Sequence, residues 1–172
     1  VITERKNGLI QFRVKKLPSG EDYYIDFGEP VYDATTTGNP EFNTNVLRYN
    51  YTSLTTPNSV YDYNMDTKEK KLMKQQEIVG GYDPAGYVSE RLYATAKDGT
   101  KIPISLVYKK GYAKDGSAPL LLYAYGSYGY SMDATFSANR LSLLNRGFVF
   151  AIAHIRGGQE MGRSWYEDGK MM

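Results

Sequence analysis

Hydrophobic and polar side chains alternate along the first part of the chain. The alternation is clearest in four runs, at residues 10–14, 23–27, 47–51 and 61–65. A period of two places the apolar set on one face of a strand and the polar set on the other. Turn residues separate the runs and no helical period interrupts them. The pattern therefore predicts four consecutive antiparallel strands, as in a sandwich or a blade of a propeller.

The pattern changes in the second half of the chain. Residues 66–86 lie between the two patterns, and their run of charges and their glycines predict a solvated turn and a linker. Beyond them, residues 91–96 and 102–108 flank Asp98-Gly99, a dipeptide that strongly favours a β-hairpin.

A strand, a helix and a second strand are predicted after the hairpin. Leu120–Tyr125 is a continuous apolar run, which is typical of a strand buried on both faces. Residues 134–146 predict a helix that Gly147 ends, and residues 148–155 predict another apolar strand. Since a strand–helix–strand unit is nearly always a right-handed parallel crossover, this part predicts the opening of an α/β sheet.

Composition narrows the classes of protein. The chain has 172 residues, with 21 Lys and Arg against 19 Asp and Glu, and this balance argues against a nucleic-acid-binding surface. No apolar run is long enough to cross a membrane. The absence of cysteine excludes disulfides, cysteine–zinc sites and iron–sulfur clusters, and a single histidine, His154, excludes any site that needs two imidazoles.

Two glycine-rich loops, Gly126–Gly129 and Arg156–Glu160, follow the predicted apolar strands. Ligands of open α/β sheets bind beyond the carboxyl ends of the strands, so the loops predict a site at this edge, with simple turns as the alternative. Ser127 lacks the first glycine of a nucleophile elbow, and His154 lies in an apolar strand, where a packed, hydrogen-bonded histidine is expected. The chain therefore shows no Ser-His-Asp set, and it lacks the common phosphate-binding motifs.

Three segments carry a resemblance to a known family. Leu122–Gly129, Ala153–Gly162 and Trp165–Lys170 closely resemble the prolyl oligopeptidase family of serine peptidases, and within it the oligopeptidase B subfamily. Shorter segments of the first half, such as Glu29-Pro30 and Ser53–Pro57, are similar to the same subfamily. The resemblance spans nearly the whole chain.

The resemblance implies a two-domain architecture, because the family joins a seven-bladed β-propeller to an α/β-hydrolase domain. Residues 1–78 would be the C-terminal part of the propeller, and residues 79–172 the N-terminal part of the peptidase domain. The chain would be an internal fragment, with the catalytic Ser, Asp and His beyond Met172. We therefore expect the fragment alone to lack peptidase activity and to associate with itself or with the remainder of the protein.

The resemblance also implies roles for particular residues. Tyr125 matches the family tyrosine that donates its hydroxyl to the oxyanion, with a packing role as the alternative. Asp133 matches the first acid of a pair linked to the residue before the cleaved position. Thr135 stands at the second position, which weakens the expected preference for a second basic residue. The alternative for Asp133 is that it caps the helix predicted to begin near residue 134.

A charged cluster in the second loop is expected to brace that loop over the active site. The charged members are Arg156, Glu160 and Arg163, whose opposite charges stand close together in the sequence, and Gly157 and Gly158 belong to the same supporting loop.

The function expected from the resemblance is hydrolysis of short peptides after Arg or Lys, through an acyl-enzyme and without metal or cofactor. Specificity after Pro is one alternative, and a non-enzymatic peptide- or glycan-binding module built from the 17 tyrosines is another. The expected partners are basic peptides, with neither nucleic acid nor membrane. A cytoplasmic location is expected, with a periplasmic or secreted one left open.

Overall fold

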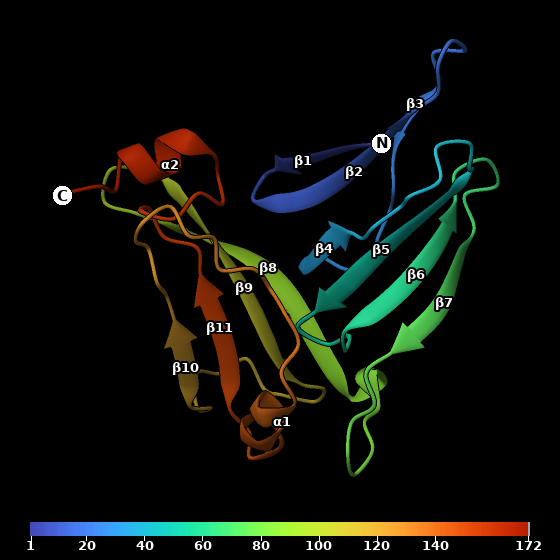
Figure 1. The fold of residues 1–172 in the computed structure, drawn as a ribbon. Coiled ribbons are helices and arrows are strands. Elements are labelled where there is room, and N and C mark those ends of the chain that lie inside the picture. Colours follow the sequence, from blue (N-terminus) through green and yellow to red (C-terminus); the bar gives the residue numbers. More distant parts are fainter. Residues whose placement is uncertain (172) are drawn as a thin grey trace.

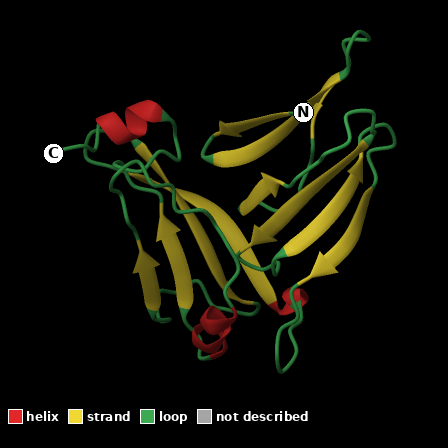
Figure 2. Ribbon diagram, viewed as in Figure 1, coloured by secondary structure: helices red, strands yellow, loops and turns green. Residues whose placement is uncertain are grey.

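The computed structural model describes residues 1–171, in which strands predominate (Figures 1 and 2). The strands are β1 Ile2–Lys6, β2 Leu9–Lys15, β3 Asp22–Tyr24, β4 Tyr32–Thr36, β5 Val46–Ser53, β6 Ser59–Asn64, β7 Lys70–Gln75, β8 Tyr87–Thr95, β9 Lys101–Lys109, β10 Leu120–Tyr123 and β11 Val149–Ala153. The helices are the 3-10 turn η1 Pro84–Gly86, α1 Ala138–Asn145 and α2 Arg163–Glu167. No helix within residues 1–171 is long and apolar enough to cross a membrane.

The described strands form three sheets. The first has the order β1-β2-β3 and the second the order β4-β5-β6-β7, and every pairing in these two sheets is antiparallel. The third sheet has the order β10-β11-β9-β8, with β10 parallel to β11 and the other neighbours antiparallel. In Figure 1 the third sheet lies on the left of the view and the second sheet on the right. This is the predicted mixture of antiparallel sheets followed by the opening of an α/β sheet.

An aromatic core joins the first two sheets. Phe12 of β2 packs its ring edge against Phe27 and Tyr49, with ring centroids 5.4 and 5.6 Å away. The apolar sets that the alternation predicted supply this core, together with residues of β4. Edge-to-face aromatic pairs add to the free energy of burial, so the two sheets pack as one unit.

The strand prediction was incomplete in the first part of the chain. Four strands were predicted there, but the structure has seven. Strands β1 and β4 lack a clear apolar alternation, and β7 begins at Lys70, inside the charged run that was predicted to be a turn. The side chains of β7 are all exposed, so ladder hydrogen bonds to β6, rather than burial, hold it as an edge strand. The predicted domain boundary after residue 78 stays a prediction.

The hairpin and the parallel crossover are confirmed, with two corrections. Strand β10 forms, but its four residues are 42–57% exposed, because it is the edge of the described sheet rather than a central strand. The helix begins at Ala138, not near residue 134. The residues just before it are not helical, because the Phe136 amide donates to Thr52 Oγ1 (3.1 Å) and the Phe136 side chain is buried.

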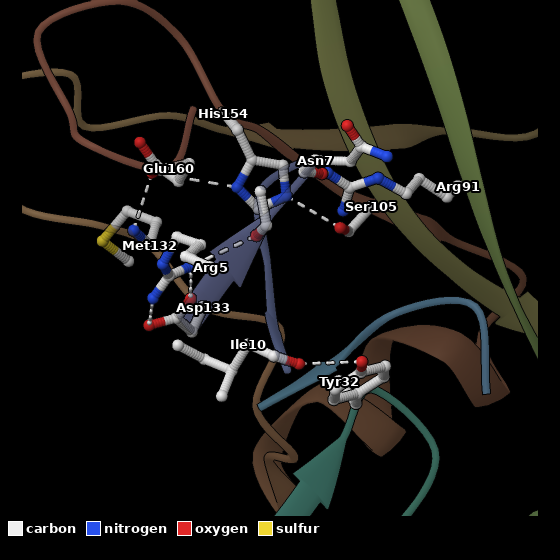
Figure 3. A network of polar contacts seen from close by, with 11 residues as sticks. Arg5, Asn7, Ile10, Tyr32, Arg91, Ser105, Met132, Asp133, His154 and Glu160 are labelled. Carbon is white, nitrogen blue, oxygen red and sulfur yellow. Dashed lines mark hydrogen bonds and ion pairs between the residues drawn. The ribbon is translucent and has the colours of Figure 1, made fainter. Parts of the chain in front are cut away.

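A buried polar cluster lies at the end of β11 (Figure 3). Glu160 is 3% exposed, and its Oε1 accepts the Met132 amide hydrogen (2.8 Å) and lies 3.8 Å from His154 Nδ1. Burial acts to raise the pKa of the Glu160 carboxyl, but the His154 side chain and the Met132 amide outweigh it and hold that pKa below its ordinary value. Glu160 therefore ties the loop after β11 to the segment before α1.

We expect the Phe12→Ala substitution to lower the free energy of unfolding by about 3–5 kcal/mol, because it leaves a cavity in the aromatic core. The Phe42→Ala substitution is the matched control, since Phe42 is 98% exposed whereas Phe12 is fully buried. The measurement is urea unfolding of the chain, followed by circular dichroism. Equal losses in the two variants would contradict this assignment of the core.

We expect Glu160→Gln to lower the free energy of unfolding at pH 7 by about 1–3 kcal/mol, because it removes a buried charged acceptor. Because the pKa of Glu160 is lower in the folded state, its ionised carboxylate stabilises the fold above pH 4.5, the ordinary pKa. This stabilisation is lost as the pH falls through the lower folded-state pKa. The difference between wild type and variant should therefore narrow below about pH 4. Urea unfolding from pH 7 to pH 3 tests this, with Glu41→Gln as the control because Glu41 is exposed. If the difference in free energy of unfolding between wild type and Glu160→Gln did not depend on pH, Glu160 would not be ionised in the folded state.

Candidate active site

The two glycine-rich loops meet at the carboxyl ends of the parallel strands β10 and β11. The Gly129 amide donates to the Gly157 carbonyl oxygen (2.9 Å). Gly157 has a φ of 98°, and a Cβ atom built there would lie 1.9 Å from the Gly126 carbonyl oxygen. Because only glycine allows this conformation and this approach, the two loops can form one surface. The sequence prediction that they share one edge of the sheet is confirmed.

Tyr125 lies where β10 ends and the first loop begins. Its ring packs edge-to-face on Tyr130, with centroids 5.9 Å apart, and 46% of its surface is exposed. Within residues 1–171, no hydrogen bond occupies its hydroxyl group. A phenol held by its ring and free at its hydroxyl can donate to a negatively charged oxygen that develops nearby.

His154 lies beneath this surface rather than on it. Its Nε2 is 2.7 Å from Ser105 Oγ of β9, and both residues are buried. Ser105, His154 and Glu160 have the residue types of a hydrolytic set, but Ser105 is fully buried and the His154–Glu160 distance of 3.8 Å exceeds a hydrogen bond. The cluster is structural, as expected for a histidine in an apolar strand. Residues 1–171 also bring together no group of three metal-ligating side chains.

Asp133 forms an ion pair with the first sheet. Arg5 Nη1 donates to Asp133 Oδ1 (2.7 Å) and Arg5 Nη2 donates to Oδ2 (3.2 Å), as drawn in Figure 3. The alternative that Asp133 caps a helix is wrong, because Ser137 precedes the first turn of α1. Thr135 lies two residues on and lines a cavity of about 650 Å³, which also contacts strands β4, β5 and β6.

The charged residues of the second loop point to different partners. Arg156 pairs with Asp98 of the β8–β9 hairpin (2.6 Å), and Arg163 pairs with Glu167 within α2. Among the described residues no ion pair joins Arg156 or Arg163 to Glu160, so the predicted mutual cluster is not formed. Gly158 lies against the Glu160 carboxylate, where a Cβ atom would come within 2.1 Å of Oε2. The loop is braced instead by the hairpin, by α2 and by the buried carboxylate.

Sequence reasoning missed three residues around this surface, namely Arg5, Asp98 and Ser105. Arg5 is 128 residues away from Asp133, and no local pattern links the two. Ser105 stands in a predicted strand, but its contact with His154 depends on the pairing of β9 with β11. Only Asp98 had a local signal, the hairpin turn, which indicated its position but not its partner.

Two family models match the chain. The one described as "Prolyl oligopeptidase, N-terminal beta-propeller domain" matches residues 1–76, and the one described as "Prolyl oligopeptidase family" matches residues 134–172. The first match contains strands β1 to β7, which form the first two sheets. The second contains α1, β11, the Arg156–Glu160 loop and α2.

Curated relatives cover almost the whole chain. Dipeptidyl aminopeptidase BI of Pseudoxanthomonas mexicana is 54% identical over 172 residues, which is 99% of this chain and 24% of the relative. Protease 2 of Moraxella lacunata is 42% identical over 171 residues, again 99% of this chain and 24% of the relative. The chain thus spans about a quarter of the length of the curated relatives it matches.

Solved structures agree with these matches. Oligopeptidase B from Leishmania major superposes with a TM-score of 0.83 at 38% identity, over 97% of this chain and 24% of that chain. Oligopeptidase B from Trypanosoma brucei, in a closed form with covalently bound antipain, gives 0.84 at 38% identity, over 97% and 25%. Sequence, fold and the loop surface therefore lead to one conclusion, that this chain belongs to the prolyl oligopeptidase family.

Proposed function

We propose that the chain is part of a serine endopeptidase of the oligopeptidase B type, which hydrolyses short peptides after Arg or Lys. The observation that carries the proposal is Tyr125, whose hydroxyl makes no hydrogen bond within residues 1–171 and which stands at the carboxyl end of β10 beside the two packed glycine-rich loops. The relatives include protease 2 and the solved oligopeptidases B, which supports this activity for the whole protein. The nucleophilic serine, its histidine and its aspartate are proposed to come from sequence beyond Met172.

The proposed chemistry proceeds through an acyl-enzyme. The histidine takes the serine proton as the serine oxygen attacks the carbonyl carbon of the peptide bond, and the carbonyl oxygen becomes an oxyanion. Tyr125 donates a hydrogen bond from its hydroxyl to that oxyanion. The amine then leaves with a proton from the histidine, and water hydrolyses the ester. A fixed donor is most effective where water is excluded, so Tyr125 requires the rest of the protein to enclose it.

Asp133 is proposed to lie near the substrate residue that precedes the cleaved position. The Met132 amide is fixed by the buried Glu160 carboxylate, so the position of Asp133 is set by the same contact that orders the second loop. The carboxylate already has Arg5 as its partner in this structure.

A second candidate activity is release of dipeptides from a free N-terminus. The 54% identity to dipeptidyl aminopeptidase BI favours it. Cleavage after Pro has weaker support, because the prolyl endopeptidase of Elizabethkingia meningoseptica is 36% identical over 73% of this chain. A tyrosine-built binding module has the weakest support. Tyr49, Tyr51 and Tyr63 are buried in the aromatic core, and the exposed Tyr125, Tyr128 and Tyr130 lie in or beside the Gly126–Gly129 loop, where the peptidase site is proposed.

We expect the full-length protein that contains this chain to hydrolyse N-blocked arginyl and lysyl amides faster than N-blocked prolyl amides. Fluorogenic amides with equal leaving groups give the kcat/KM values directly. Dipeptidyl amides with free and blocked N-termini separate the second candidate, because a dipeptidyl aminopeptidase requires the free amine. Faster hydrolysis of the prolyl amide, or a strict need for a free amine, would contradict the proposal.

We expect Tyr125→Phe in the full-length protein to lower kcat by about 100- to 1,000-fold, because one oxyanion donor is lost while the ring still packs on Tyr130. The KM for the arginyl amide should change little. Tyr93→Phe is the matched control, since Tyr93 is a half-exposed tyrosine on β8, outside the loop surface. Wild-type turnover by the Tyr125 variant would exclude a role as oxyanion donor.

A further inference from the structure

Arg5 engages both oxygens of the Asp133 carboxylate (Figure 3). The pair is partly buried, with 23% of the Arg5 side chain and 27% of the Asp133 side chain exposed. Arg5 Nη1 also donates to the Gly8 carbonyl oxygen (3.1 Å). Two-point contacts between a guanidinium and a carboxylate are among the strongest charge-assisted hydrogen bonds in proteins.

Both partners are held in place by other contacts. The turn that follows β1 is fixed because Arg91 Nη2 donates to the Asn7 carbonyl oxygen (2.7 Å). Asp133 is fixed because its neighbour Met132 is hydrogen-bonded to buried Glu160 (2.8 Å). Because these contacts fix the backbone beside both residues, less conformational entropy is lost when the two side chains pair.

A basic substrate side chain would need the contacts that Arg5 already makes. An incoming guanidinium also prefers two parallel bonds to a carboxylate. Arg5 supplies that geometry and compensates the charge of Asp133. Arg5 of the first sheet therefore places against Asp133 a guanidinium, the same group that an arginine of the substrate would offer.

A second carboxylate, that of Asp33, lies near the Arg5–Asp133 pair. Asp33 of β4 faces the same cavity as Thr135, and its register partner Thr52 accepts the Phe136 amide. Burial, together with the nearby Asp133 carboxylate, raises the pKa of Asp33, and Arg5 opposes this effect. The ion pair of Arg5 is with Asp133, so removal of Arg5 would leave that carboxylate free to meet an incoming cation.

We propose that Arg5 is a specificity-determining residue, which occupies Asp133 and so suppresses selection of a second basic residue just before the cleaved one. The inference rests on the proposed peptidase function. It concerns only the choice between substrates with one and with two basic residues. Thr135, which is neutral where the resemblance implies an acid, acts in the same direction.

The test compares two N-blocked amides in the full-length protein, one ending in Arg-Arg and one in Gly-Arg. We expect Arg5→Met to raise the ratio of their kcat/KM values about tenfold, mainly through a lower KM for the dibasic amide. Arg5→Lys, which keeps a cation beside Asp133, should leave the ratio close to wild type. The double variant Arg5→Met/Asp133→Asn should lose most of the increase, because the uncovered carboxylate is gone.

Arg13→Met is the matched control, because Arg13 lies on the same hairpin and makes a two-point pair with Asp22 instead. Its ratio should equal that of the wild type. If Arg5→Met fails to fold, Asp133→Asn alone tests the proposal. Because Arg5 already occupies the Asp133 carboxylate, this variant should change the ratio of kcat/KM values only slightly. A tenfold fall in the ratio would show that the carboxylate is not occupied and would overturn the proposal.

The outcomes distinguish the two proposals. An equal loss on both amides in Arg5→Met would mean a purely structural pair and would overturn the specificity role, while the peptidase function stands. The same holds for an unchanged ratio in a folded Arg5→Met variant. A wild-type protein that cleaves neither amide would overturn the peptidase function, and the inference with it.

Discussion

The arrangement of the loop surface depends on the buried carboxylate of Glu160. An ionised carboxylate removed from water is costly unless hydrogen bonds and charge compensate it, and Glu160 finds compensation in the Met132 amide and beside His154. This requirement draws the segment between β10 and α1 onto the loop that follows β11. The same contact sets where Asp133 lies, and thus where it meets Arg5. Gly157 then decides how closely the two loops can approach.

Burial separates the structural polar residues from those that can act on a substrate. Ser105 and His154 are hydrogen-bonded, yet no substrate can reach them, because the sheet covers both. Tyr125 has the opposite character: it is half-exposed, and no hydrogen bond holds its hydroxyl within the described residues. The buried serine and histidine therefore have a structural role, as the sequence led us to expect for His154. The exposed hydroxyl at the end of β10 is the reason for proposing a role in the chemistry for Tyr125.

The role proposed for the contact between Arg5 and Asp133 would let an antiparallel sheet influence a site built on an α/β sheet. Specificity is a difference between affinities, and an internal competitor lowers the affinity for one substrate class without any change in the reacting groups. The identity to both a protease 2 and a dipeptidyl aminopeptidase is compatible with such tuning within one fold. The specificity of a family member can then vary through residues of its first sheets.

The sequence by itself determined the strand-rich first part, the β8–β9 hairpin, the β10–α1–β11 crossover and the meeting of the two glycine-rich loops. These follow from local periods and turn residues, which act over a few positions. Only the tertiary structure decided that β1, β4 and β7 are strands, that the segment before Ala138 is not helical, and that Arg5 reaches Asp133. Those outcomes depend on edge pairing, on a buried side chain at Phe136 and on a contact across 128 positions. No local pattern records such contacts, because their free energy comes from packing between segments that are distant in the sequence.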